Sequence, residues 1–135
     1  MNAGFTAAGA TPWLPVPPSA ATINVKAEQD DPNSLLAWYR SLIRLKKTNP
    51  VFARGEDTML DTSNTKVLNW LRQAPGAPAV VVSVNFTAEP QTVSLSIPGA
   101  GRKLKTLLKT PGAADPVSLD QIVLVPFGVY IGEVQ

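Results

Sequence analysis

From residue 51 onward the hydrophobic residues recur with a period of two, the spacing of side chains on one face of a β-strand. Pro-Gly and Asp-Pro pairs interrupt this pattern and mark turns between short strands. No helical pattern separates the strands, so we expect a mainly β fold, an antiparallel β-sandwich. The predicted strands are residues 58–61, 67–72, 79–85, 91–97, 103–108, 121–125 and 129–133.

Two of the predicted strands also indicate how they are buried. Residues 91–97 alternate strictly, so Val93, Leu95 and Ile97 should face the core while the residues between them face solvent. Residues 79–84 are almost continuously apolar, which is typical of a central strand that is covered on both faces.

One α-helix is predicted before the strands, at residues 31–47. Asp31 is the expected N-cap, Pro32 the first helical residue, and Asn49-Pro50 the end of the helix. Residues 1–30 are rich in proline and show no periodicity, so we expect them to form a long loop.

The predicted helix carries a wide apolar stripe with the spacing i, i+3, i+4 and i+7. Leu35, Tyr39, Leu42 and Ile43 belong to this stripe. A stripe of this width must bury against a substantial surface, and left uncovered it would drive association. We therefore predict that these four residues form an association face, used by a second copy of the chain or by another polypeptide.

The composition excludes several kinds of chemistry. The 135 residues include no Cys and no His, which excludes disulfides, thiolate nucleophiles, Ser-His triads and zinc sites built on Cys or His. The net charge of +2 is too weak to indicate nucleic acid, and no apolar run is long enough to span a membrane. We expect no metal, cofactor, nucleic acid or membrane. Since the segment before Lys26 lacks the basic start of a secretion signal, we expect a cytoplasmic location.

Three local motifs have structural interpretations that we favour over functional ones. Glu28, Asp30 and Asp31 lie beside the expected helix start, where capping explains them better than a metal site. The basic residues within 102–109 match a solvated edge strand better than a polyanion site. Asn85-Phe86-Thr87 has the N-glycosylation pattern, which we interpret as chance, with Asn85 ending a strand.

The order of the short motifs in the first half of the chain is distinctive. They are NAGFT at residues 2–6, PWLPV at 12–16, INV at 23–25, DPNSLLAWYRSLIRL at 31–45 and NPV at 49–51. This order resembles the C-terminal part of glycoside hydrolase family 13, the α-amylase family. It is most similar to the group of α-glucosidases, oligo-1,6-glucosidases and trehalose synthases.

The resemblance implies a domain organisation. Residues 1–48 would be a remnant of the family's (α/β)8 barrel, namely the loop after the eighth strand and the eighth helix. Residues 49–135 would be the C-terminal antiparallel β domain. The family's catalytic carboxylates belong to earlier barrel strands, so the resemblance implies that this chain contains no catalytic residue. We expect a non-catalytic segment that supports an α-glucosidase-like barrel in oligosaccharide metabolism, and no hydrolysis by the chain alone.

Four residues are candidates for contact with sugar. The resemblance places Asn2 and Phe5 near the substrate of an intact enzyme. Trp13 and Trp70 could stack on pyranose rings, because exposed aromatic faces offer large rigid contact areas. Trp13 lies in the proline-rich loop and should be the better exposed of the two, whereas Trp70 lies on a strand face that should be half-buried at best. An α-glucan oligosaccharide is therefore a possible ligand. Two alternatives stay open, a stand-alone carbohydrate-binding module and an assembly protein that reuses the fold; otherwise the expected partner is a polypeptide that supplies the rest of the barrel.

Overall fold

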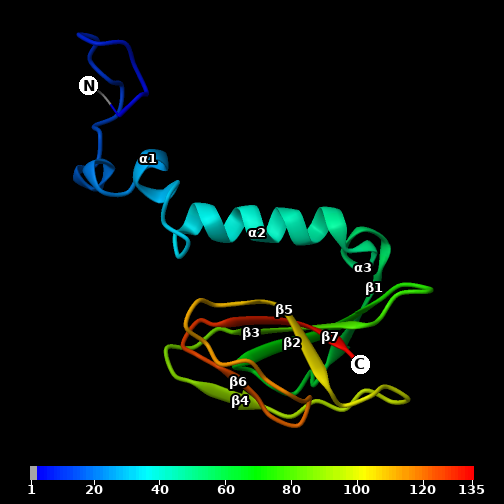
Figure 1. The fold of residues 1–135 in the computed structure, drawn as a ribbon. Helices are drawn as coiled ribbons and strands as arrows, with labels where there is room; N and C mark the ends of the chain where they lie inside the picture. The colour runs from blue at the N-terminus through cyan, green and yellow to red at the C-terminus, as the bar shows by residue number, and fades with distance from the viewer. Residues whose placement is uncertain (1–2) are drawn as a thin grey trace. The chain divides into compact units, whose positions relative to one another are not determined.

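The computed structural model describes residues 3–135 and divides the chain after Arg40 into two compact units (Figure 1). The first unit contains a long loop, the 3-10 helix η1 (Pro18–Ala21), the short helix α1 (Val25–Glu28) and the first residues of a longer helix. The expectation of a continuous loop over residues 1–30 is therefore corrected by two helical turns. Asn24 starts α1, since its side-chain oxygen accepts a hydrogen bond from the Ala27 amide at 2.9 Å.

The long helix α2 spans Leu35–Thr48, so the predicted start at Asp31 is wrong. Ser34 caps the helix: its hydroxyl oxygen accepts from the Ala37 amide at 3.1 Å, while its hydroxyl group lies 2.7 Å from the Asp31 carbonyl. Asp31 instead closes a local turn by accepting from the Asn33 amide at 2.8 Å. The Glu28 carboxylate accepts from the amide of Leu36 at 3.0 Å. This contact agrees with the capping interpretation for that acid.

A short helix that the sequence pattern did not reveal follows α2 directly. Helix α3 spans Pro50–Arg54, with Pro50 in its first turn. The Asn49 side chain accepts from the Val51 amide at 2.9 Å and so caps α3. The same Asn-Pro pair that ends α2, as predicted, therefore begins a second helix.

The second unit is a two-layered antiparallel β structure, as the sequence predicted (Figure 1). The larger sheet has the order β1-β2-β3-β7-β5, and the smaller sheet pairs β4 with β6. The predicted strand over residues 91–97 is shorter than expected, since β4 ends at Val93, but Val93 and Leu95 are buried as predicted. The strands are β1 (Glu56–Leu60), β2 (Val67–Gln73), β3 (Val80–Asn85), β4 (Gln91–Val93), β5 (Leu104–Lys109), β6 (Ile122–Leu124) and β7 (Val129–Val134).

The main core lies between the two sheets. It contains Val67 and Val81 from the larger sheet and Ile122 and Leu124 from the smaller one, with Tyr130 beside them. A second cluster lies on the opposite face of the larger sheet. Its buried members are Val51, Val80, Val82 and Ile131. Because β3 is buried on both faces and lies in the middle of the sheet, the prediction of a central strand is confirmed.

Among the described residues, no helix has the length and apolar character needed to cross a lipid bilayer.

Candidate functional site

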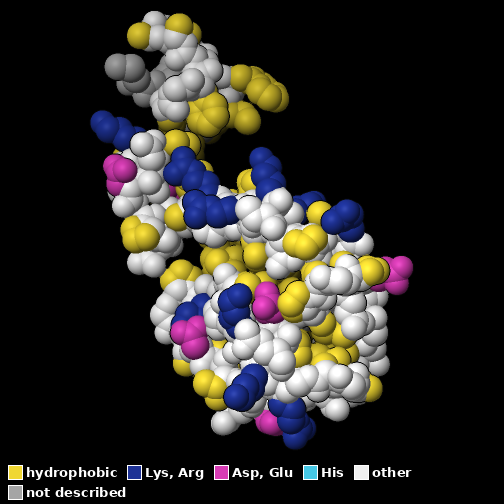
Figure 2. Space-filling model, turned by 45° about the vertical axis from the view of Figure 1, so that its right-hand side comes forward, with side chains coloured by type: hydrophobic (Ala, Val, Ile, Leu, Met, Phe, Trp, Pro, Cys, Tyr) yellow, Lys and Arg dark blue, Asp and Glu magenta, His cyan; other side chains and the backbone are white. Residues whose placement is uncertain are grey.

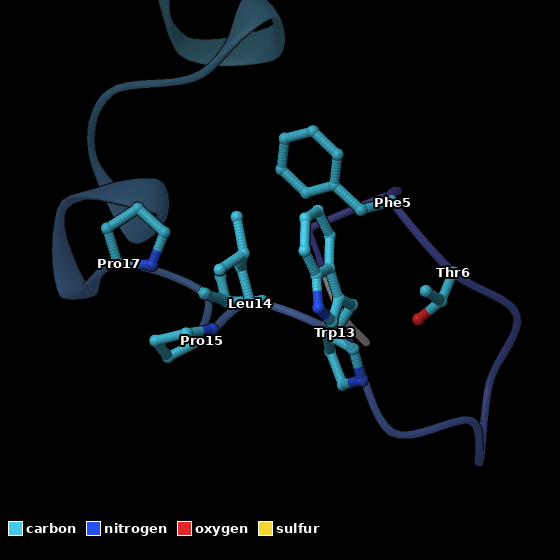
Figure 3. Close-up of a pocket in the computed structure, with 8 residues that line it drawn as sticks. Phe5, Thr6, Trp13, Leu14, Pro15 and Pro17 are labelled. Atoms are coloured by element: carbon cyan, nitrogen blue, oxygen red, sulfur yellow. The ribbon is translucent and has the colours of Figure 1, made fainter.

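The strongest candidate site is a hollow formed by the N-terminal loop alone (Figure 3). It has a volume of about 380 Å³. Gly4 and Gly9 adopt φ values of 85° and 86°, which turn the chain where side chains with a Cβ would be strained. The lining residues are Phe5, Thr6, Pro12, Trp13, Leu14, Pro15, Val16 and Pro17.

The aromatic residues of this hollow are unusually open to solvent. Phe5 is 79% exposed and Trp13 is 94% exposed. In Figure 3 both rings border the hollow, with Leu14 and Pro15 on the same stretch of chain as Trp13. Figure 2 shows the same character at the surface, since the most N-terminal segment carries hydrophobic side chains and no charged ones. The exposure expected for Trp13 is confirmed.

The chemistry available in the hollow is contact rather than catalysis. Exposed ring faces can stack on a pyranose, and the prolines hold the backbone between them in a restricted conformation. The polar side-chain groups of the lining are the Thr6 hydroxyl and the Trp13 indole N–H. Neither can act as the carboxylate pair that glycoside hydrolysis requires. Asn2, predicted beside Phe5, lies outside the described residues.

The predicted association face divides into two parts. Leu35, Tyr39 and Ile43 repeat every four residues along α2 and are 64%, 57% and 52% exposed. Leu42 differs, because it is half-buried and packs with Leu45 against the cluster on the larger sheet. The exposed face is therefore Leu35, Tyr39 and Ile43, and Leu42 is corrected to a residue that attaches α2 to the chain's own sheet.

Trp70 lies on the outer face of β2, in a shallow hollow of about 260 Å³. It pairs with Met59 of β1 and is half-buried against the second cluster, as the sequence predicted for its strand face. Asp57, Leu68 and Arg72 complete the lining.

Arg72 is the polar centre beside this hollow, and the sequence pattern did not single it out. Its Nη1 donates to Asp57 Oδ2 at 3.0 Å and its Nη2 to the Gly55 carbonyl at 2.9 Å. Its Nε donates to the Val51 carbonyl at 3.3 Å, and its guanidinium lies 5.8 Å from the centre of the Phe52 ring. These bonds connect β2 to α3 and β1. Because the guanidinium is engaged on three sides, it is a structural group rather than a sugar-binding one.

Three of the basic residues in and beside edge strand β5 are paired with acids. Arg102 and Asp120 lie 2.9 Å apart, Lys105 and Glu133 3.6 Å, and Lys109 and Asp115 2.7 Å. The hydrogen bond from Lys109 lowers the pKa of the Asp115 carboxyl. The arrangement agrees with a solvated edge. No group of three or more acidic residues within residues 3–135 is placed to hold a metal ion.

The glycosylation-like motif is part of the core's framework. Asn85 is only 1% exposed. Its amide nitrogen donates to the Glu89 carbonyl at 2.7 Å and to the Val125 carbonyl at 2.9 Å, while its oxygen accepts from the Thr87 amide. Asn85 ends β3, as predicted, and holds two loops together.

Comparison with known proteins places the two parts of the chain in one family. Residues 1–55 match the family described as alpha-amylase, catalytic domain. A glucan 1,6-alpha-glucosidase from Streptococcus pneumoniae is 33% identical over 132 residues, which are 98% of this chain and 23% of that protein. An oligo-1,6-glucosidase from Parageobacillus thermoglucosidasius is 37% identical over 86 residues, 64% of this chain and 15% of that protein.

Solved structures extend the likeness to almost the whole chain. The trehalulose synthase from Pseudomonas mesoacidophila MX-45 superimposes with a TM-score of 0.85 at 32% sequence identity. The match covers 99% of this chain and 23% of that one. The chain belongs to the α-amylase family, glycoside hydrolase family 13. Within that family it corresponds to part of an α-glucosidase-like protein, and it spans at most about a quarter of the length of the relatives it matches.

Proposed function

We propose that this chain is the non-catalytic C-terminal segment of an α-glucosidase-like enzyme that acts on α-glucan oligosaccharides in the cytoplasm. One observation carries the proposal: the catalytic-domain match covers residues 1–55, and the β structure begins at Glu56. Residues 1–48 would then complete the catalytic barrel, and residues 49–135 would form the β domain that supports it. No cofactor or metal is assigned to this role.

The burial pattern favours a role for the first 48 residues as part of a larger barrel rather than as an independent unit. Helix α2 presents Leu35, Tyr39 and Ile43 to solvent, and the loop before it exposes Phe5 and Trp13. Large apolar side chains that recur on one face of a helix are normally covered by another element. A barrel supplied by the rest of the enzyme would cover the exposed face of α2.

The loop hollow gives this segment a second role in the proposal. Phe5 and Trp13 would contribute an apolar wall to the outer part of the sugar site. Their exposed rings can stack on glucose units, while the catalytic carboxylates come from the remainder of the enzyme. Names of the relatives agree with this substrate class, since they include glucan 1,6-alpha-glucosidase and oligo-1,6-glucosidase.

A segment exchange tests the proposal. The matched 132 residues of the Streptococcus pneumoniae relative are replaced by this chain, and glucose release from isomaltotriose is measured. We expect the exchanged enzyme to hydrolyse the substrate and this chain alone to show no turnover. Saturable hydrolysis by the chain alone, or a folded but inactive exchanged enzyme, would contradict the proposal.

A stand-alone carbohydrate-binding module is the second candidate, and the 94% exposure of Trp13 is the observation that favours it. Isomaltotriose titrated into the isolated chain would then change tryptophan fluorescence saturably. The change should be lost in Trp13→Ala and retained in Trp38→Phe. The supporting-segment proposal expects no saturable change, because a single loop wall supplies few hydrogen bonds to a sugar.

A further inference from the structure

The outer face of the larger sheet is covered on only one half. On the β3–β7 half, Leu42 and Leu45 of α2 pack with Val80, Val82 and Ile131. The contact places a helix of the catalytic-domain sequence directly against the β domain. A helix that buries one apolar stripe on a sheet is one of the standard layered arrangements of protein domains.

The β1–β2 half of the same face is open. Met59 of β1 and Leu68 of β2 are 48% and 40% exposed, and Trp70 is half-buried between them. The three side chains line the hollow of about 260 Å³ described above. Together they form what we call the β1–β2 face, defined as Met59, Leu68 and Trp70.

The edge of the β1–β2 face is fixed by polar contacts within the chain. Arg72 is held by Asp57, by the Gly55 carbonyl and by the carbonyl of Val51. This network holds the rim in place, and the hollow beside it is lined mainly by apolar side chains. An apolar centre with a polar rim is the usual composition of a protein–protein interface, whereas a sugar subsite needs hydrogen-bonding groups that remain available.

We propose that the β1–β2 face binds the apolar face of a helix from the remainder of the catalytic domain, packed next to α2 on the same sheet. The proposal rests on the proposed function. Two observations identify the occupant: α2 and the matched catalytic-domain sequence already cover the adjoining half of the face, and more than three quarters of the relatives' length lies outside this chain. The β1–β2 face thus continues an interface that begins within the chain.

A matched pair of charge substitutions tests the proposal in the exchanged enzyme described above. Leu68→Asp places a carboxylate on the β1–β2 face, and Val123→Asp places one on the outer face of the smaller sheet. The two residues are 40% and 42% exposed in this chain, so both variants should have equal, small effects on the isolated chain. In the exchanged enzyme, Leu68→Asp should lower the midpoint of thermal inactivation by about 4 °C or more, because it would bury a charge in an apolar interface. Val123→Asp should leave the midpoint within about 1 °C, as a solvent-exposed substitution does.

The outcomes separate this proposal from the proposed function. An active exchanged enzyme in which both variants inactivate at the same temperature overturns the docking proposal alone, whereas a folded but inactive unsubstituted exchange overturns the proposed function. Loss of folded enzyme with Leu68→Asp but not with Val123→Asp supports docking. The comparison is then repeated with Leu68→Thr and Val123→Thr, which introduce a hydroxyl group in place of a charge.

Two other occupants would each overturn the docking proposal. If the isolated chain is a dimer that Leu68→Asp converts to a monomer, while both variants of the exchanged enzyme behave alike, the occupant is a second copy. If isomaltotriose changes the fluorescence of the isolated chain saturably and Trp70→Ala abolishes the change, the occupant is a sugar.

Discussion

The segment up to Arg40 and the β unit after it both contain large apolar side chains, but the first exposes them to solvent and the second buries them. Phe5, Trp13 and Leu14 are 79%, 94% and 63% exposed, whereas Ile122 and Val81 are fully buried. In the β unit, two sheets of the same chain cover one another. The N-terminal segment has a loop, two short helices and only the first residues of α2, and these do not enclose their own apolar residues. The β unit therefore encloses its own core, whereas the apolar residues of the N-terminal segment stay open, and in the proposed function the rest of the enzyme would cover those on its helix.

The largest expected difference between the regions is in their tolerance of cavities. Leu119→Ala removes a side chain that is 2% exposed in the core between the sheets, and it should cost about 2–5 kcal/mol of unfolding free energy. Leu14→Ala removes the same atoms from a side chain that is 63% exposed, and it should change stability by less than about 0.5 kcal/mol. Urea unfolding of the two variants measures both values. Equal losses would show that the N-terminal loop is packed in solution.

Asparagine side chains give a second comparison. Asn85→Ala leaves the carbonyls of Glu89 and Val125 without their buried donor, and it should cost about 1–3 kcal/mol. Asn24→Ala removes the cap of the four-residue helix α1, and the unfolding midpoint of the β unit should not move. Urea unfolding followed by tryptophan emission tests this, and a shifted midpoint for Asn24→Ala would link the two regions energetically.

The cap of α2 sharpens the comparison at the boundary between the two regions. Ser34→Ala should destabilise the helix by about 1 kcal/mol, because the Ala37 amide loses its acceptor. Asp31→Ala is the matched control, since its carboxylate closes a turn outside the helix. The far-ultraviolet circular dichroism of the two variants separates them. A larger loss of helical signal in Asp31→Ala would restore Asp31 as the cap.

Alkaline stability tests the burial of Tyr130 in the core. Burial raises the pKa of its phenol above the ordinary value of 10.0. Stability is therefore complete below that pH and falls as the pH rises toward the folded pKa, because the unfolded chain releases the proton first. Tyr130→Phe should remove part of this decline, whereas Tyr39→Phe, at a 57% exposed position, should not. Identical pH profiles for all three proteins would contradict the assignment.

The smallest expected effect is at the acidic end, at Asp115. Its pKa is lowered from 3.8 by the hydrogen bond from Lys109, so its contribution is present above that pH and is lost as the pH falls through the folded value. Since the pair is at the surface, Asp115→Asn should remove only a small part of the decrease in stability at acidic pH. The effect is measured as the unfolding free energy in low salt between pH 2 and about 6, the range in which carboxyl groups titrate. A steeper loss of stability with falling pH in Asp115→Asn than in the unsubstituted chain would contradict this prediction.

Much of the β unit could be predicted from the sequence because its signals are local. The nearly continuous apolar run over residues 79–84 identified β3 as a central strand, and the alternation after Gln91 identified Val93 and Leu95 as core residues. The helix boundaries were harder to predict from the sequence. Asp31-Pro32 has the residue types of a helix start, but Ser34 competes with it and makes the cap.

The candidate site was predicted only in part. The exposure of Trp13 followed from its proline-rich surroundings, which allow no helix or sheet to cover it. The network of Arg72 could not be found in this way, because it joins carbonyls of Val51 and Gly55 that are remote in sequence. The pair Asn49-Pro50 did carry a usable signal for α3, as an N-cap followed by a first-turn proline.

The sequence by itself determined the antiparallel β class, the central strand and the resemblance to the α-amylase family, because periodicity and motif order are properties of neighbouring residues. Only the tertiary structure decided which side of α2 is covered. Leu42 and Ile43 are adjacent and equally apolar, yet one packs on the sheet and the other faces solvent. That choice depends on where the sheet lies, and an amphipathic stripe does not contain that information.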